Sequence, residues 1–132
     1  MKHKHTFKIV SSIILLTALI IGMSMFTQRL LNKDSLILNQ WIEEIEKCAK
    51  TEDWDQAEAS LKKVNELWSE VKRTWSALID HQEIDNIDVT LSRLQVLVEI
   101  KEVPNSLSEA AALRKYIGHI PAKEKLDFEN LF

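Results

Sequence analysis

Residues 54–78 read WDQAEASLKKVNELWSEVKRTWSAL, and the rest of the chain is arranged around them. The apolar side chains of this stretch recur every three or four residues, which places them on one face of an α-helix. They are Trp54, Ala57, Leu61, Val64, Trp68, Val71, Trp75 and Leu78. At ~1.5 Å per residue, such a helix is about 40 Å long. The stretch therefore predicts a long helix whose apolar face packs against other helices.

Turn-forming residues are scarce in this chain of 132 residues. It holds two Gly and two Pro, and residues 27–103 contain neither. Small all-β domains need turn residues about every 8 to 12 residues, so this long interval excludes that class. Residues 29–132 therefore predict an all-α domain, an antiparallel bundle of about four helices.

Charge is distributed unevenly along the chain. No Asp or Glu precedes Asp34, whereas Lys2, Lys4 and Lys8 stand near the N-terminus. Setting those three lysines aside leaves 14 of the 17 Lys and Arg residues against all 20 acidic residues, a net charge of −6 for residues 29–132. A domain this acidic is a poor partner for nucleic acid or for an anionic membrane surface. We therefore expect no nucleic-acid partner.

Residues 9–28 carry no charge and read IVSSIILLTALIIGMSMFTQ, between Lys8 and Arg29. A helix of this length spans ~30 Å, the thickness of a bilayer core. The basic residues ahead of the run place residues 1–8 in the cytoplasm by the positive-inside rule, and residues 29–132 outside it. The sequence thus predicts a single-pass protein of the cell membrane, with a transmembrane helix over residues 9–28.

Residues 9–28 have two other interpretations. A signal peptide could be cleaved at the small-residue site Gly22-Met23-Ser24. The apolar run continues past that site through Met25 and Phe26, which favours an uncleaved anchor. A buried core helix is disfavoured because the run is apolar on every face.

The chain has no helix breaker directly after the anchor. We therefore expect the membrane helix to run on through residues 30–50, or to break only briefly near residues 32–35. The apolar face of this part holds Leu31, Leu38, Trp41, Ile45 and Cys48. Residues 51–53 then form a turn, and Asp53 with Gln56 is typical of the capping box that begins a helix.

A third helix is expected after an acidic turn, with Asp85 or Asn86 as its N-cap. One apolar face of this helix holds Ile84, Ile87, Leu91, Leu94 and Val98. The face is broadened, as expected of a helix with more than one neighbour, by Val89, Val96, Leu97 and Ile100. We expect Val103-Pro104-Asn105 to end this helix.

The fourth helix is expected to begin at a second capping box, Ser106-Leu107-Ser108-Glu109. Gly118 suits its left-handed C-terminal cap, with Pro121 shortly after it. A short further turn could dock four apolar side chains on the bundle, those of Leu126, Phe128, Leu131 and Phe132. The start of residues 54–78 resembles the first helix of a tetratricopeptide repeat, but no copy follows at the ~34-residue offset of a repeat array.

The densest group of polar side chains lies between residues 80 and 88. Its candidate site residues are Asp80, His81, Glu83, Asp85, Asn86 and Asp88. A calcium loop of the EF-hand type is excluded because no Gly holds the sharp-turn position. The segment also lacks the His-x-x-x-His or paired-Cys spacing of a zinc site. A well-capped turn is the favoured interpretation, ahead of a partner-docking surface and of a metal or catalytic site.

Other residues give little support to catalysis. The four tryptophans could stack on a sugar or peptide, but all lie on apolar helix faces, which favours core packing: Trp41, Trp54, Trp68 and Trp75. Cys48 has no disulfide partner in the chain and also lies on such a face. The sequence contains no nucleophile–base pairing and no Gly-rich phosphate loop. We therefore expect neither an enzyme activity nor a cofactor.

From Trp75 to Ile87 the chain reads WSALIDHQEIDNI. Here it resembles a family of short, membrane-anchored bacterial proteins, mostly from spore-forming Gram-positive lineages, that is known only as a domain of unknown function. The likeness extends to the Lys-flanked anchor, the Trp-rich central helix and the ending IGHIP at residues 117–121. The resemblance implies single-pass anchoring and a helical external domain, and it carries over no catalytic residue.

These features predict a non-enzymatic, membrane-anchored protein whose external bundle docks on a membrane or cell-envelope protein. The alternative is a sensor that binds a ligand or a metal ion through residues 80–88. The apolar face of residues 54–78 could also form a homodimeric coiled coil. Packing within the chain is favoured because three further helices carry matching faces, and the oligomeric state is left open.

Overall fold

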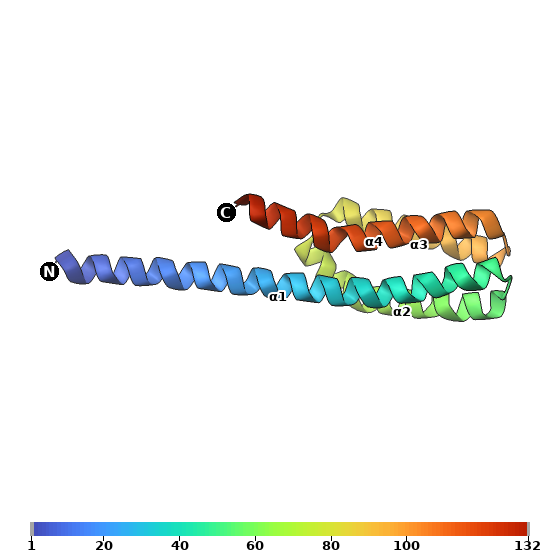
Figure 1. Cartoon of the computed structure of the whole chain (residues 1–132), viewed down its shortest axis with the longest axis horizontal. Helices are drawn as coiled ribbons and strands as arrows, with labels where there is room; N and C mark the ends of the chain where they lie inside the picture. Colours follow the sequence, from blue (N-terminus) through green and yellow to red (C-terminus); the bar gives the residue numbers. More distant parts are fainter. Residues whose placement is uncertain (1, 132) are drawn as a thin grey trace.

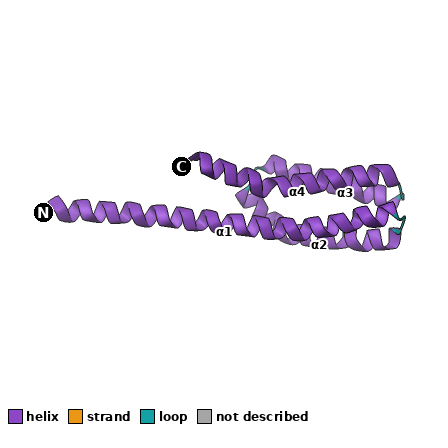
Figure 2. Cartoon of the chain, in the orientation of Figure 1, coloured by secondary structure: helices purple, strands orange, loops and turns teal. Residues whose placement is uncertain are grey.

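The computed structural model describes residues 2–131, without the side chains of residues 2, 126–128 and 131. Four α-helices are joined by short loops: α1 (Lys2–Lys50), α2 (Trp54–Leu78), α3 (His81–Glu99) and α4 (Val103–Leu131). The first half of α1 projects alone, and its second half forms a bundle with the other three helices (Figure 1). Residues 2–131 contain no strand (Figure 2). The predicted all-α bundle is confirmed.

Successive helices of the bundle run antiparallel, because each loop reverses the chain within a few residues (Figure 1). Helix α1 packs against α2 and α4, and α3 packs against α4. The contact between α2 and α3 is the least extensive of the four. The loops at the end of the bundle farthest from the N-terminus contain Glu52 and Lys101, with φ angles of 55° and 57°. A left-handed residue of this kind commonly ends a helix, although the position usually holds Gly.

The apolar face of α2 forms the centre of the core. All eight predicted residues of this face are buried or packed against the buried cluster. Trp75 is completely buried, and its ring meets that of Trp68 edge to face, with 5.6 Å between the ring centroids. Helix α1 contributes its predicted apolar face to this core. It also contributes Ile42 and Ala49, which the spacing of apolar residues had not identified. The face of α2 is thus covered within the chain.

Helix α1 continues without a break from the apolar segment into the bundle, as expected. Residues 3–23 are exposed on every face, and partial burial begins at Ser24. The helix contains an 18-residue window with a mean hydropathy of 2.4, none of it buried. By length and composition, it is the one described helix that could cross a membrane.

The caps of α2 and α3 show one success and one error of the sequence-based prediction. Asp53 caps α2 as predicted, since its Oδ1 accepts from the backbone N–H of Gln56 at 3.3 Å. Helix α3, however, begins at His81 and is capped by Asp80, whose Oδ1 accepts from the N–H of Gln82 at 2.9 Å. The predicted caps, Asp85 and Asn86, lie inside α3. The extended Ile79 lets a two-residue loop reverse the chain, so the first available carboxylate serves as the cap.

The predicted start of α4 at Ser106 is also wrong. The helix begins at Val103, and the Glu102 carboxylate accepts from the backbone N–H of Asn105 at 2.8 Å. Pro104 therefore stands in the first turn of α4, where its missing N–H removes no helical hydrogen bond. Ser106 is fully buried instead of capping the helix.

Gly118 and Pro121 do not end α4, contrary to prediction. The helix continues through both residues to Leu131, and Gly118 lacks the positive φ of a left-handed cap. Pro121 has no N–H to donate to the Ile117 carbonyl, but the Ser35 hydroxyl of α1 donates to that oxygen at 3.1 Å. The added turn predicted after Lys123 is part of this helix. The predicted docking of Leu126, Phe128, Leu131 and Phe132 lies outside the described side chains.

Candidate functional site

The polar segment of residues 80–88 forms the loop before α3 and the first turns of that helix. Asp80 is the N-cap of α3, and His81 and Asp85 are exposed to solvent. Asn86 is half-buried. The remaining two candidates, Glu83 and Asp88, make contacts with other helices. The segment therefore distributes its side chains over different faces of α3.

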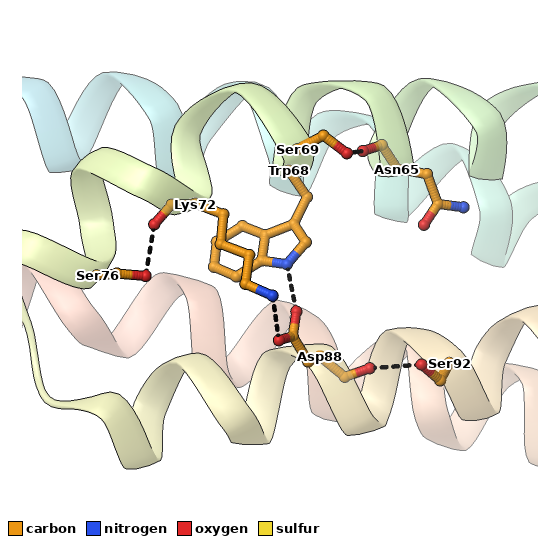
Figure 3. A network of polar contacts seen from close by, with 7 residues as sticks. All are labelled: Asn65, Trp68, Ser69, Lys72, Ser76, Asp88 and Ser92. Atoms are coloured by element: carbon orange, nitrogen blue, oxygen red, sulfur yellow. Dashed lines mark hydrogen bonds and ion pairs between the residues drawn. The ribbon is translucent and has the colours of Figure 1, made fainter.

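Glu83 and Asp88 each tie α3 to a different helix. Glu83 accepts a hydrogen bond from Lys123 Nζ of α4 at 3.0 Å. Asp88 accepts from Trp68 Nε1 of α2 at 2.7 Å, and its second oxygen forms an ion pair with Lys72 (Figure 3). Charge-assisted hydrogen bonds of this kind are stronger than neutral ones. These two carboxylates hold the bundle together and are not grouped around a common point.

The described side chains do not gather into a metal centre. Within the described part of the chain, no group of three or more His, Cys, Asp or Glu side chains is placed to hold a metal ion. Burial raises the pKa of the Cys48 thiol, and the nearby carboxylates of Glu44 and Asp53 raise it further. The thiol therefore stays protonated at neutral pH, and only the thiolate is an effective nucleophile.

A groove between α3 and α4 exposes two valine side chains, Val89 and Val96, on the surface of the bundle. It has a volume of about 660 Å³. Its lining consists of Asp88, Val89, Ser92, Arg93, Val96 and Leu97 from α3, with Asn105 and Glu109 from α4. Asp88 is the one sequence-predicted candidate that borders it. We refer to these eight residues as the α3–α4 groove.

Helix α3 meets two neighbours, α2 and α4, as its broad apolar face predicted, but three of the residues that broaden this face remain largely in solvent. Val89 is 49% exposed, Val96 is 55% exposed and Ile100 is 64% exposed. Helix α3 packs one apolar face against α2 and α4 and leaves this second row in solvent. The seven-residue step from Val89 to Val96 was visible in the sequence, but Asn105 and Glu109 join the site only through the tertiary fold.

Two other features are less suited to be the site. A crevice of about 500 Å³ between α2 and α3 is lined mainly by charged and amide side chains, including Glu58, Lys62 and Asn65. The tryptophans are buried or, in the case of Trp41, half-buried against the core. Their predicted role in core packing is confirmed, and no exposed aromatic platform for a sugar or peptide is formed by them.

Comparison with known proteins gives one match. A family model described as "Domain of unknown function (DUF4363)" matches residues 25–131, most of the chain. The match covers the bundle and begins where α1 starts to contact it. No curated protein and no solved structure matches the chain.

Proposed function

The chain belongs to the DUF4363 family, and we propose that it is a membrane-anchored docking module with its bundle outside the cytoplasm. The module has no catalytic role of its own. Its partner is a membrane or cell-envelope protein, which it binds through the α3–α4 groove.

Anchoring is supported by the exposed apolar half of α1. Residues 3–23 are exposed on every face of the helix, and their apolar side chains would be costly to leave in water. Lys2, Lys4 and Lys8 favour a cytoplasmic N-terminus. Because α1 passes unbroken into the bundle, the membrane segment and the groove belong to one stiff body.

The exposed apolar row of the α3–α4 groove carries the docking proposal. Val89 and Val96 stand two helical turns apart on the surface of an acidic domain. Both valines are already about half covered, so completing their burial contributes on the order of 1 kcal/mol each, and a helix laid along this row would gain affinity at both positions. Arg93 and Glu109 offer opposite charges at the rim, which would orient such a partner.

Photocrosslinking in intact membranes tests this proposal. A photoreactive amino acid at Ser92, inside the groove, is expected to capture a protein, whereas the same amino acid at the exposed Lys47 of α1 is not. Val96→Asp should reduce the Ser92 adduct at least about tenfold, because it places an unpaired charge in the apolar contact. Leu36→Asp changes an exposed apolar residue outside the groove and should leave the adduct unchanged.

Two results would count against docking at this groove. One is a Ser92 probe that captures no more protein than the Lys47 probe. The other is equal loss of the adduct in Val96→Asp and Leu36→Asp, which would indicate a general defect. Carbonate extraction of the same membranes checks the anchor separately, since an anchored chain stays in the pellet.

A further inference from the structure

A crevice lies where the C-terminal part of α4 meets α1, just beyond the exposed apolar segment. It has a volume of about 390 Å³. Four of its lining residues come from α1 and two from α4: Ser24, Met25, Gln28, Arg29, Lys125 and Glu129. Gln28 also donates to the Pro121 carbonyl at 2.7 Å, which holds α4 against α1 at this level. We refer to these six residues as the α1–α4 crevice.

The position of the crevice along α1 sets its depth relative to a bilayer. The uncharged residues 9–28 of α1 span the ~30 Å of the hydrocarbon core, with Lys8 and Arg29 at its two edges. Arg29 therefore lies at the outer edge of that core, and the crevice, which runs along α1 from Ser24 to Arg29, opens at that level. This placement rests on the proposed anchoring. A phospholipid headgroup is the molecule that occupies this depth.

The lining offers charges of both signs to such a headgroup. Among the described side chains, Arg29 takes part in no ion pair. Lys125 Nζ lies 3.9 Å from Glu129 Oε1, and both side chains are more than half exposed, so this pair is weak. The crevice therefore presents two cations suited to a phosphate and one carboxylate suited to an ammonium group. Met25 supplies apolar surface on the side of the acyl chains.

We propose that the α1–α4 crevice binds the headgroup of phosphatidylethanolamine from the outer leaflet. Arg29 and Lys125 contact the phosphate, and Glu129 accepts hydrogen bonds from the primary ammonium. Phosphatidylglycerol lacks the ammonium and would bring a net negative charge to Glu129. Phosphatidylcholine has a quaternary ammonium that cannot donate a hydrogen bond to a carboxylate. The mixed charge of the lining thus selects a zwitterionic lipid with a primary amine.

Native mass spectrometry of the full-length protein in detergent tests the proposal. The protein is mixed with equal amounts of phosphatidylethanolamine, phosphatidylglycerol and phosphatidylcholine that carry the same acyl chains. We expect phosphatidylethanolamine to be retained most. Arg29→Gln should lower its retention about tenfold, because a charge-assisted contact to the phosphate is lost. Glu129→Gln should abolish the preference for phosphatidylethanolamine over the other two lipids.

Lys33→Gln is the matched control, since Lys33 is an exposed cation of α1 that does not line the crevice. It should retain phosphatidylethanolamine as the unchanged protein does. Equal retention of the three lipids, or a preference for phosphatidylglycerol, would overturn the proposal. So would an Arg29→Gln variant that behaves like Lys33→Gln.

The outcome is independent of partner docking. Val96→Asp should bind the lipid normally, so failure of the groove proposal leaves this result intact. Failure of the anchor would instead appear as protein that leaves the membrane pellet on carbonate extraction. Circular dichroism of each variant checks that the helices remain, and because Arg29 and Glu129 are exposed, their substitution should leave the fold intact.

Discussion

At the scale of single residues, Asp88 shows how one side chain can serve two neighbours. One oxygen accepts from the Trp68 indole N–H, and the other pairs with Lys72 (Figure 3). The indole ring is buried in the core, so its N–H depends on this acceptor. A buried donor without a partner costs more than the loss of an exposed ion pair.

We therefore expect Asp88→Ala to lower the free energy of unfolding by about 1–3 kcal/mol, because the Trp68 N–H loses its acceptor. Asp88→Asn keeps an acceptor oxygen and loses only the ion pair, whose side chains are 44% and 34% exposed, so its cost should stay below about 1 kcal/mol. Thermal unfolding of the full-length protein in detergent, followed by tryptophan fluorescence, measures both. Asp85→Ala is the control, since Asp85 is exposed. Equal effects of Asp88→Ala and Asp88→Asn would contradict the assigned role of the indole hydrogen bond.

At the scale of the helix, α4 owes its length to α1. Pro121 leaves the Ile117 carbonyl without its helical donor, and the buried Ser35 hydroxyl supplies a replacement. The Pro121 carbonyl in turn accepts from Gln28. Gly118 lets α4 approach α1 closely, because a Cβ at this position would lie 3.3 Å from Asn39 Nδ2 of α1. Side chains of one helix thus stabilise the backbone of the other.

A double-mutant cycle tests this compensation. Ser35→Ala in the unchanged protein should cost about 1–3 kcal/mol, because it leaves the buried Ile117 carbonyl unpaired. In a Pro121→Ala background the helix itself provides the N–H, so the same substitution should cost clearly less. Chemical or thermal unfolding of the unchanged protein, the two single variants and the double variant gives the coupling free energy between Ser35 and Pro121. Additive costs would show that Ser35 does not compensate for the proline.

At the scale of the whole molecule, the continuous α1 relates the membrane segment to the bundle. Helix α1 ends at Lys50, at the end of the bundle farthest from the N-terminus (Figure 1). The loop that contains Lys101 lies at the same end. With a cytoplasmic N-terminus, that loop is the part of the protein farthest outside the membrane.

Labelling of single cysteines in intact cells tests this orientation. In a Cys48→Ala background, Lys101→Cys is expected to react with a membrane-impermeant maleimide, because the proposed orientation places its loop outside the cell. Lys4→Cys should react only after the cells are opened. The reverse pattern would place the bundle in the cytoplasm, and reaction at both positions would indicate a mixed orientation. The extent of labelling is read as a mass shift on a gel.

The sequence alone determined the features that depend on neighbouring residues. The spacing of apolar side chains over residues 54–78 predicted the core face of α2, and the residues around Asp53 predicted its cap. A hydrophobic run of bilayer length identified the segment that could cross a membrane. Such signals act within a few residues, because helical periodicity and capping are local interactions.

Only the tertiary structure decided where a helix would continue past a helix-breaking residue and which apolar faces would stay exposed. Pro121 stays inside α4 because Ser35, 82 residues before Ile117, donates to the carbonyl that the proline leaves without a helical donor. The second apolar row of α3 remains uncovered because none of the four described helices packs on that side. The α1–α4 crevice forms where two distant segments meet. Each outcome depends on contacts between segments far apart in the chain, which periodicity along one helix does not encode.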